Sequence, residues 1–162
     1  MAAKVLILMG SKSDAEVMAE VSRVLEKFGI HFSTTVTSAH RSPDRTRKLV
    51  REAEKKGYSV IIAGAGMAAH LAGVVAAETV LPVIGVPLAG SPLSGLDSLL
   101  STAQMPGGVP VATMAIGKAG AQNAAYLAAQ ILALSDAKLR RKLREWRRDM
   151  AKAVAETAKE IR

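Results

Sequence analysis

The sequence predicts a three-layer α/β/α sandwich, an α/β fold in which helices cover both faces of a parallel sheet. Short apolar runs alternate with longer segments of helical periodicity, and the runs are apolar throughout rather than at every second position. Strands of that kind are buried on both faces, which is typical of a parallel sheet. The winding is expected to be flavodoxin-like or Rossmann-like. Since the chain has the length of one domain and shows no linker or internal repeat, residues 1–162 are expected to form a single domain.

The expected strands are Val- and Ile-rich runs that end at turn-forming residues. The third run opens a long apolar stretch, 60–77, whose glycines and His70 indicate a strand, a turn and a buried helix rather than a membrane span. The fourth is bracketed by Pro82 and Pro87. Strands are predicted at residues 5–9, 30–36, 60–63, 83–86 and 111–116.

Six helices fill the intervals, and local signals mark several of their ends. The first has Asp14 in its first turn and Gly29 just past its end. Pro43 suits the first position of the second helix, and Gly57 stops it. Helices are predicted at residues 13–28, 43–56, 70–79, 96–104, 121–134 and 136–161, and the loop 105–110 is expected to act as a cover.

The formal net charge of +8 comes from 22 Lys+Arg and 14 Asp+Glu, and its excess is local. Residues 138–162 hold 10 basic and 4 acidic residues, so most of it lies in a basic C-terminal helix, 136–162. Such charges more often form a solvated face than a binding surface, and aromatic residues for base stacking make up only 3%. We therefore expect no nucleic-acid partner.

The absence of cysteine excludes disulfides, thiolate nucleophiles and cysteine-based zinc sites, and it suits a reducing cytoplasm. The apolar run near the N-terminus is too short for a signal peptide. A cytoplasmic protein with no membrane partner is expected.

Polar residues follow the first strand, at the sheet edge where open α/β folds bind ligands. Gly10 is expected to permit a tight turn, and Ser11 and Ser13 then meet the start of a helix, which can cradle a phosphate. Asp14 suits ribose hydroxyls. The alternative is that the serines only cap the helix.

The second strand ends in a similar cluster directly before a helix. Arg41 can bind a phosphate through its two guanidinium nitrogens, Ser38 can donate to it, and His40 can transfer protons near neutral pH.

The third strand ends at Gly64 and Gly66, which formally begin a GxGxxA dinucleotide pattern. We interpret these glycines as letting the backbone approach a smaller ligand, because the next strand ends without the acidic residue that holds a ribose. His70 is equally compatible with two roles: a catalytic histidine, or one that is either satisfied in the core or supports the residues that touch the ligand. His31 is expected to be structural.

The sequence lacks the patterns of three other kinds of functional site. The segment 117–120 lacks the pattern of a phosphate-binding P-loop, Gly-x-Ser-x-Gly is absent, and three separated histidines without clustered carboxylates give no metal site. The remaining prediction is proton transfer on a small nucleotide, with no cofactor and no metal.

With these residues in place, the sequence resembles the PurE family of purine biosynthesis, the N5-carboxyaminoimidazole ribonucleotide mutases. The motifs that carry the resemblance run through nearly the whole chain, except for the basic terminal helix: GSKSD (10–14), SAHRSPD (38–44), AGAGMAAHLAG (63–73), LPVIGVP (81–87), LSGLDSLLSTAQMPGGVPVAT (93–113) and AIGKAGAQNAAYLAAQIL (115–132).

The resemblance implies a Rossmann-like homo-octamer that moves a carboxylate from the exocyclic nitrogen of an imidazole nucleotide to ring carbon C4, using neither ATP nor metal. It implies two catalytic histidines, His40 as the general acid/base and His70 lining the pocket beside Gly66 and Leu71. The substrate-binding residues that it implies are Gly10, Ser11, Ser13, Asp14, Ser38, Ala39, Arg41, Gly66 and Leu71.

Three positions depart from the usual family pattern: Met67 for Gly, Ala72 for Pro, and Ser42 for Thr. They bear on substrate affinity rather than on the activity. Two other functions stay open: a carboxylase that takes free CO2, which Arg41 and His70 disfavour, and a non-catalytic nucleotide-binding module.

Overall fold

The computed structural model describes residues 4–161 and contains one five-stranded sheet in which every neighbouring pair of strands is parallel. The strand order is β2-β1-β3-β4-β5, which is the flavodoxin-like order. The strands are β1 (Lys4–Met9), β2 (His31–Val36), β3 (Tyr58–Gly66), β4 (Val83–Leu88) and β5 (Ala112–Thr113). The chain runs from β1 outward to β2 and then back across to β3, so the carboxyl ends of β1 and β3 form the switch point where such folds bind ligands.

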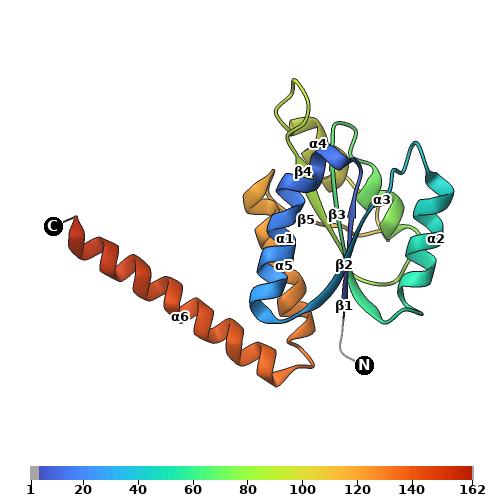
Figure 1. Cartoon of the computed structure of the whole chain (residues 1–162). Helices are drawn as coiled ribbons and strands as arrows, with labels where there is room; N and C mark the ends of the chain where they lie inside the picture. The colour runs from blue at the N-terminus through green and yellow to red at the C-terminus, as the bar shows by residue number, and fades with distance from the viewer. Residues whose placement is uncertain (1–3, 162) are drawn as a thin grey trace.

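Helices cover both faces of the sheet, as the α/β/α prediction requires (Figure 1). One core layer lies between the sheet and α1, α5 and the start of α6; the other lies between the sheet and α2 and α3. The helices are α1 (Ala15–Phe28), α2 (Pro43–Ala53), α3 (Leu71–Ala76), α4 (Leu96–Ala103), α5 (Lys118–Leu132) and α6 (Ala137–Glu160), and a short 3-10 helix, η1 (Lys12–Asp14), precedes α1.

Several predicted boundaries were wrong. The first helix does not begin at residue 13, because η1 comes first, and the second and third helices end earlier than expected, at Ala53 and Ala76. The fifth strand has two residues instead of six. β4 continues through Pro87 to Leu88, which is possible because β5 pairs only with Ile84 and Gly85. Proline lacks an N–H, so it is tolerated in a strand where one side is unpaired.

The basic helix α6 begins at the opposite end of the sheet from the strand-end motifs. Asp136 caps it by accepting hydrogen bonds from the N–H groups of Lys138 and Leu139. Leu139 and Leu143 are its buried residues, and Trp146 stacks on Tyr126 of α5 with ring centroids 4.0 Å apart. Beyond Trp146 the helix extends away from the body (Figure 1). Among the described residues, no helix is both long and apolar enough to cross a membrane.

Candidate active site

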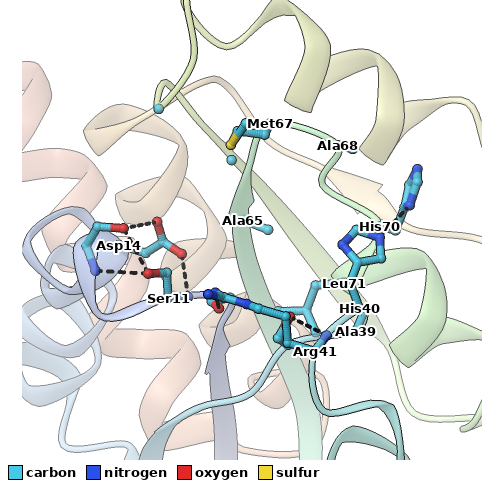
Figure 2. Close-up of a pocket in the computed structure, with 15 residues that line it drawn as sticks. Ser11, Asp14, Ala39, His40, Arg41, Ala65, Met67, Ala68, His70 and Leu71 are labelled. Atoms are coloured by element: carbon cyan, nitrogen blue, oxygen red, sulfur yellow. Dashed lines mark hydrogen bonds between the residues drawn. The ribbon is translucent and has the colours of Figure 1, made fainter.

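A cavity of about 470 Å³ lies at the carboxyl ends of the strands, over the switch point between β1 and β3 (Figure 2). All eleven residues predicted to bind substrate or transfer protons line it. Four lining residues were missed: Ala65, Met67, Ala68 and Gly90. The first three fall within the segment 63–73, in which the glycines, His70 and Leu71 carried a predicted role and Met67 was noted only as a departure from the family pattern. Gly90 follows β4, a strand end that carries no side chain with evident chemistry, so only its position in the topology could have indicated it.

The polar side of the cavity begins after β1 with a capping box. The N–H of Ser11 donates to the Asp14 carboxylate at 2.9 Å, and the Ser13 N–H lies 3.4 Å from the Ser11 hydroxyl oxygen. The serines therefore do cap the helix, as the alternative interpretation held, but Ser11 and Ser13 also line the cavity. The predicted cradle of free backbone N–H groups needs correction, because the box already engages two of them. The hydroxyls remain as donors for a phosphate.

Gly10 does not serve the purpose that was expected of it. Its φ lies outside the left-handed region, so its turn does not require glycine. Its N–H donates to the Gly64 carbonyl at 3.0 Å, and a Cβ added here would meet only the Ala65 Cβ and an Asp14 carboxylate oxygen at ordinary contact distances of 3.5 and 3.6 Å. The residue lines the cavity without being needed for a tight turn.

The Asp14 carboxylate is half-buried at this end of the cavity. Burial raises its pKa above the ordinary aspartate value, against the opposing effect of hydrogen bonds from the Ser11 N–H and the Ser13 hydroxyl. A carboxylate that is partly withdrawn from water is a strong acceptor for a ligand hydroxyl.

A chain of hydroxyl groups holds the loop after β2. The Ser42 hydroxyl donates to the Ser38 carbonyl at 3.2 Å and accepts from the Ser38 N–H at 3.0 Å. The Arg41 N–H donates to the Ser38 hydroxyl at 3.1 Å, which leaves the proton of that hydroxyl for a ligand. Beneath the loop, Thr46 donates to the Ser42 carbonyl and pairs with Thr37 at 2.8 Å; both threonines are buried.

This buried threonine pair was not predicted. The sequence offered no signal for it beyond two polar residues, one just after the strand and one in the helix, at positions that face the interior.

The loop presents Arg41 and His40 to the cavity from different sides. The Arg41 guanidinium reaches across to the end of β1, 3.5 Å from the Gly10 carbonyl oxygen, and so lies near Ser11 (Figure 2). His40 points toward the turn after β3.

His40 and His70 form a direct pair. Nε2 of His40 lies 2.9 Å from Nδ1 of His70, and the rings are nearly perpendicular, at 83°. One of these nitrogens must carry the shared hydrogen, so the pair accommodates one added proton but not a hydrogen on both facing nitrogens. Both residues are exposed to the cavity side, so the alternative of a buried core histidine at position 70 is wrong.

The two glycines in the last residues of β3, Gly64 and Gly66, have different surroundings. A Cβ at Gly64 would lie 2.3 Å from the Met18 sulfur of α1, so Gly64 serves helix packing and not ligand approach, contrary to expectation. A Cβ at Gly66 would lie 3.2 Å from the Leu88 carbonyl, and Gly66 also lines the cavity. α3 begins only at Leu71, so the turn lacks the immediate strand-to-helix step of a dinucleotide site.

The predicted cover is absent from the cavity within this chain. No residue of the loop 105–110 lines it, and Met105 instead packs close to Gly73 of α3. His31 lies at the amino end of β2, where it is exposed and does not line the cavity. Within residues 4–161, no three His, Asp or Glu side chains cluster in a way that could hold a metal ion.

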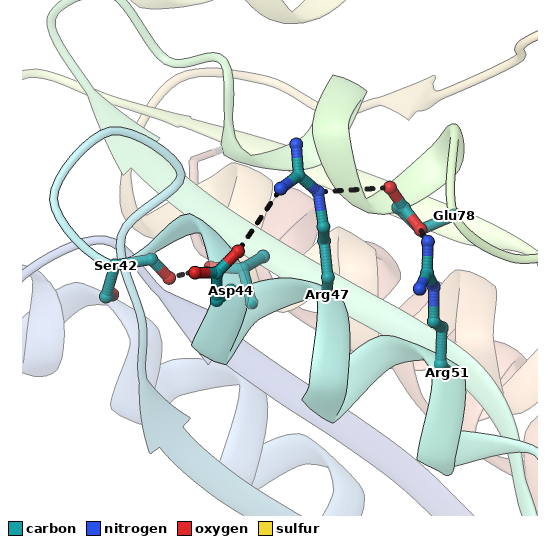
Figure 3. A network of polar contacts seen from close by, with 6 residues as sticks. Ser42, Asp44, Arg47, Arg51 and Glu78 are labelled. Carbon is teal, nitrogen blue, oxygen red and sulfur yellow. Dashed lines mark hydrogen bonds and ion pairs between the residues drawn. The ribbon is translucent and has the colours of Figure 1, made fainter.

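An ion-pair network ties α2, which follows His40, to the residues just after α3, which follows His70 (Figure 3). Glu78, whose side chain is 20% exposed, lies 2.8 Å from Arg51 and 3.4 Å from Arg47. Arg47 also pairs with Asp44 at 3.3 Å. The network therefore links the two segments of the chain that follow the histidines.

We expect Glu78→Gln to lower the free energy of unfolding by about 1 kcal/mol, because two guanidinium groups lose their shared carboxylate. Urea denaturation measures it. The matched control is Glu52→Gln, which removes an exposed i,i+4 pair between Glu52 of α2 and Lys56, just beyond the end of that helix, and is expected to leave the midpoint unchanged. Equal shifts of the urea midpoint in the two variants would show that the network stabilises the fold no more than an isolated exposed ion pair does.

Comparisons with known proteins show the family of the chain. The family model described as AIR carboxylase matches residues 4–153. A protein of Brucella melitensis is 54% identical over 96% of this chain and 96% of its own length, and one of Escherichia coli is 52% identical over 95% and 91%. A Pyrococcus horikoshii protein is 52% identical over 96% and 86%. All three carry the name N5-carboxyaminoimidazole ribonucleotide mutase.

Solved structures show the same fold. Two crystal structures of Treponema denticola PurE proteins superpose with TM-scores of 0.90 and 0.88, each at 27% identity. They cover 99% and 98% of this chain, and in each case 98% of the other chain.

Proposed function

Since the chain belongs to the AIR carboxylase family, we propose that it is an N5-carboxyaminoimidazole ribonucleotide mutase, an isomerase of purine biosynthesis. The observation that carries the proposal is the His40–His70 pair in a cavity of nucleotide size, in a chain more than half identical to enzymes of that name. Such a cavity lies within the range of small-molecule sites, about 300–1,000 Å³.

The substrate lies with its phosphate and ribose on the polar side of the cavity. Arg41, Ser11 and Ser13 bind the phosphate, and Ser38 donates to it. The Asp14 carboxylate accepts from the ribose hydroxyls. The imidazole ring then reaches the histidine pair, beside the apolar side chains of Ala39 and Leu71 and the backbone of Gly66.

Two proton transfers complete the reaction. The protonated His40 gives its proton to the exocyclic nitrogen of the carbamate, whose C–N bond breaks with its electron pair retained by nitrogen, and neutral CO2 is released into the cavity. Ring carbon C4 of the substrate then attacks CO2, and the C4 proton returns to the imidazole side chain of His40. This transfer restores both the aromaticity of the substrate ring and the protonated His40. Each proton transfer by a placed side chain contributes about 10²–10⁴-fold.

His70 supports His40 in this scheme. Because its Nδ1 bonds to Nε2 of His40, it holds the ring orientation of its partner and exchanges a proton with it. We assign no cofactor or metal to this chemistry, since neither proton transfer requires one.

Labelled bicarbonate separates the mutase from the carboxylase that takes free CO2. We expect turnover of the carbamate nucleotide without added bicarbonate and with little label in the product, because the carboxylate never leaves the cavity. The measurement is label incorporation per product formed. Rapid incorporation, with aminoimidazole ribonucleotide as the productive substrate, would contradict the mutase and support the carboxylase. Binding without any chemistry would leave a nucleotide-binding module.

We further propose that the chain works as one domain, in the cytoplasm, and as a homo-oligomer. The family resemblance suggests an octamer. The exposed apolar residues Val154, on the projecting helix α6, and Ile161, directly after it, support contact with other subunits.

A further inference from the structure

Ser42 occupies the position at which a serine usually caps a helix, but its side chain bonds elsewhere. It directly precedes Pro43, the first residue of α2, and a serine at this position normally accepts a hydrogen bond from an N–H in the first helical turn. Among the described residues 4–161, the Ser42 side chain makes no such capping bond. Its hydroxyl turns back into the loop after β2 instead, so this side chain serves the loop rather than the helix.

Both hydrogen bonds of the Ser42 hydroxyl go to the backbone of Ser38. The oxygen accepts from the Ser38 N–H at 3.0 Å, and the hydroxyl donates to the Ser38 carbonyl at 3.2 Å. The Ser42 N–H donates to the same carbonyl at 3.0 Å. These bonds close residues 38–42 into a ring, and both of the serines that close it are partly buried.

The ring carries side chains that face the cavity. Residues 39–41 lie between the two closing serines and line the cavity, whereas Ser42 itself is not part of its wall. Nε2 of His40 lies 2.9 Å from Nδ1 of His70, and the Arg41 guanidinium reaches the end of β1 (Figure 2). Both contacts join the loop to other strand ends, so they depend on where the ring holds the backbone of residues 39–41.

We propose that Ser42 is a positioning residue of the active site, whose hydroxyl closes the loop and thereby holds His40 where it can transfer protons. This inference rests on the proposed function. Without the hydroxyl, the Ser38 N–H loses its acceptor and the ring keeps only its backbone bond. The backbone of residues 39–41 then gains freedom. A displacement of about 1 Å at a reacting group can lower a rate about 100-fold, so Ser42 affects turnover without touching a reacting atom.

The test compares Ser42→Ala, Ser42→Val and Ser42→Thr with wild type on the carbamate nucleotide. Threonine and valine have nearly the same shape, so the difference between their variants isolates the hydroxyl group. We expect Ser42→Ala and Ser42→Val to lower kcat at least about tenfold and to raise KM about threefold, because the loop carries both His40 and Arg41. Ser42→Thr keeps the hydroxyl, and its kcat and KM are expected to stay close to those of wild type. Rates are expressed per folded protein, with the folded fraction at the assay temperature measured by circular dichroism.

Ser101→Ala is the matched control. The Ser101 hydroxyl is also partly buried and also donates to a carbonyl four residues back, that of Asp97 at 2.7 Å. It belongs to α4 and does not line the cavity. The kcat and KM of Ser101→Ala are therefore expected to equal those of wild type.

Loss of turnover in Ser42→Ala and Ser42→Val, with rescue by Ser42→Thr and normal rates in Ser101→Ala, supports the positioning role. An unchanged kcat in Ser42→Val, with product still formed, would overturn the inference and leave the mutase intact. Equal losses in Ser42→Thr and Ser42→Val would also overturn it, because the hydroxyl would then not be what holds the loop. A loss that disappears once rates are expressed per folded protein would overturn it as well, since Ser42 would then only stabilise the fold. Wild type that forms no product from the carbamate would overturn the proposed function itself, and the inference with it.

Discussion

His40→Asn is expected to lower kcat by about 10²–10⁴-fold, because asparagine neither donates nor accepts a proton near neutral pH. Its amide preserves one hydrogen-bonding group where His40 Nδ1 stands, so the loop after β2 keeps its hydroxyl bonds and the nucleotide still binds. We therefore expect KM to change little. Steady-state kinetics on the carbamate nucleotide measure both quantities, and direct titration of a nucleotide measures binding independently.

The matched control is His31→Asn. His31 is also exposed and also lies at a strand end, but this is the amino end of β2 and lies outside the cavity. The kcat of His31→Asn is therefore expected to equal that of wild type. Near-normal turnover in His40→Asn would remove His40 from the mechanism. Equal losses in both variants, together with a lower unfolding midpoint, would indicate damage to the fold instead.

Most of the site was predictable because it follows from topology. In a parallel sheet the carboxyl ends of all strands meet at one edge, so polar residues after β1, β2 and β3 had to gather there. Residues 10–14 directly follow β1, which is buried and has an unambiguous apolar pattern, and residues 38–41 lie just after β2, an exposed edge strand, and before the helix start at Pro43. Their placement therefore required no knowledge of side-chain direction.

The remainder depended on packing that a linear pattern does not contain. His40 and His70 are far apart in the chain, and their contact requires the tight turn after Met67. Gly64 looked like a ligand residue because the Met18 side chain that occupies its space comes from a helix packed on the sheet. Likewise, Pro87 was expected to mark the end of the fourth strand. The strand continues through it because β5 is too short to pair with Pro87, and the length of β5 depends on a different segment of the chain.

Asp14→Asn is expected to weaken nucleotide affinity about 10-fold to 100-fold, the range for losing a hydrogen bond to a charged group of about 1.5–3 kcal/mol. The same variant is expected to be at least as stable as wild type at neutral pH. Burial raises the pKa of Asp14, so the folded state disfavours its ionised form. The amide oxygen of asparagine still accepts the Ser11 N–H that closes the capping box, and it carries no charge to desolvate.

The stability of Asp14→Asn is also expected to depend on pH. A carboxyl whose folded pKa is raised destabilises the fold wherever it is ionised, and that penalty disappears as the pH falls toward the ordinary aspartate range, about pH 4. The stability advantage of Asp14→Asn is therefore expected to be largest at neutral pH and to shrink on acidification, as followed by urea denaturation at several pH values. Asp44→Asn is the control, because Asp44 also lies in the first turn of a helix but is exposed, pairs with Arg47 and lies outside the cavity. Unchanged affinity combined with lower stability in Asp14→Asn would make Asp14 a helix cap and nothing more. Weaker affinity without loss of stability would instead show that the fold tolerates a partly buried charge at the end of β1 because that charge binds the ribose.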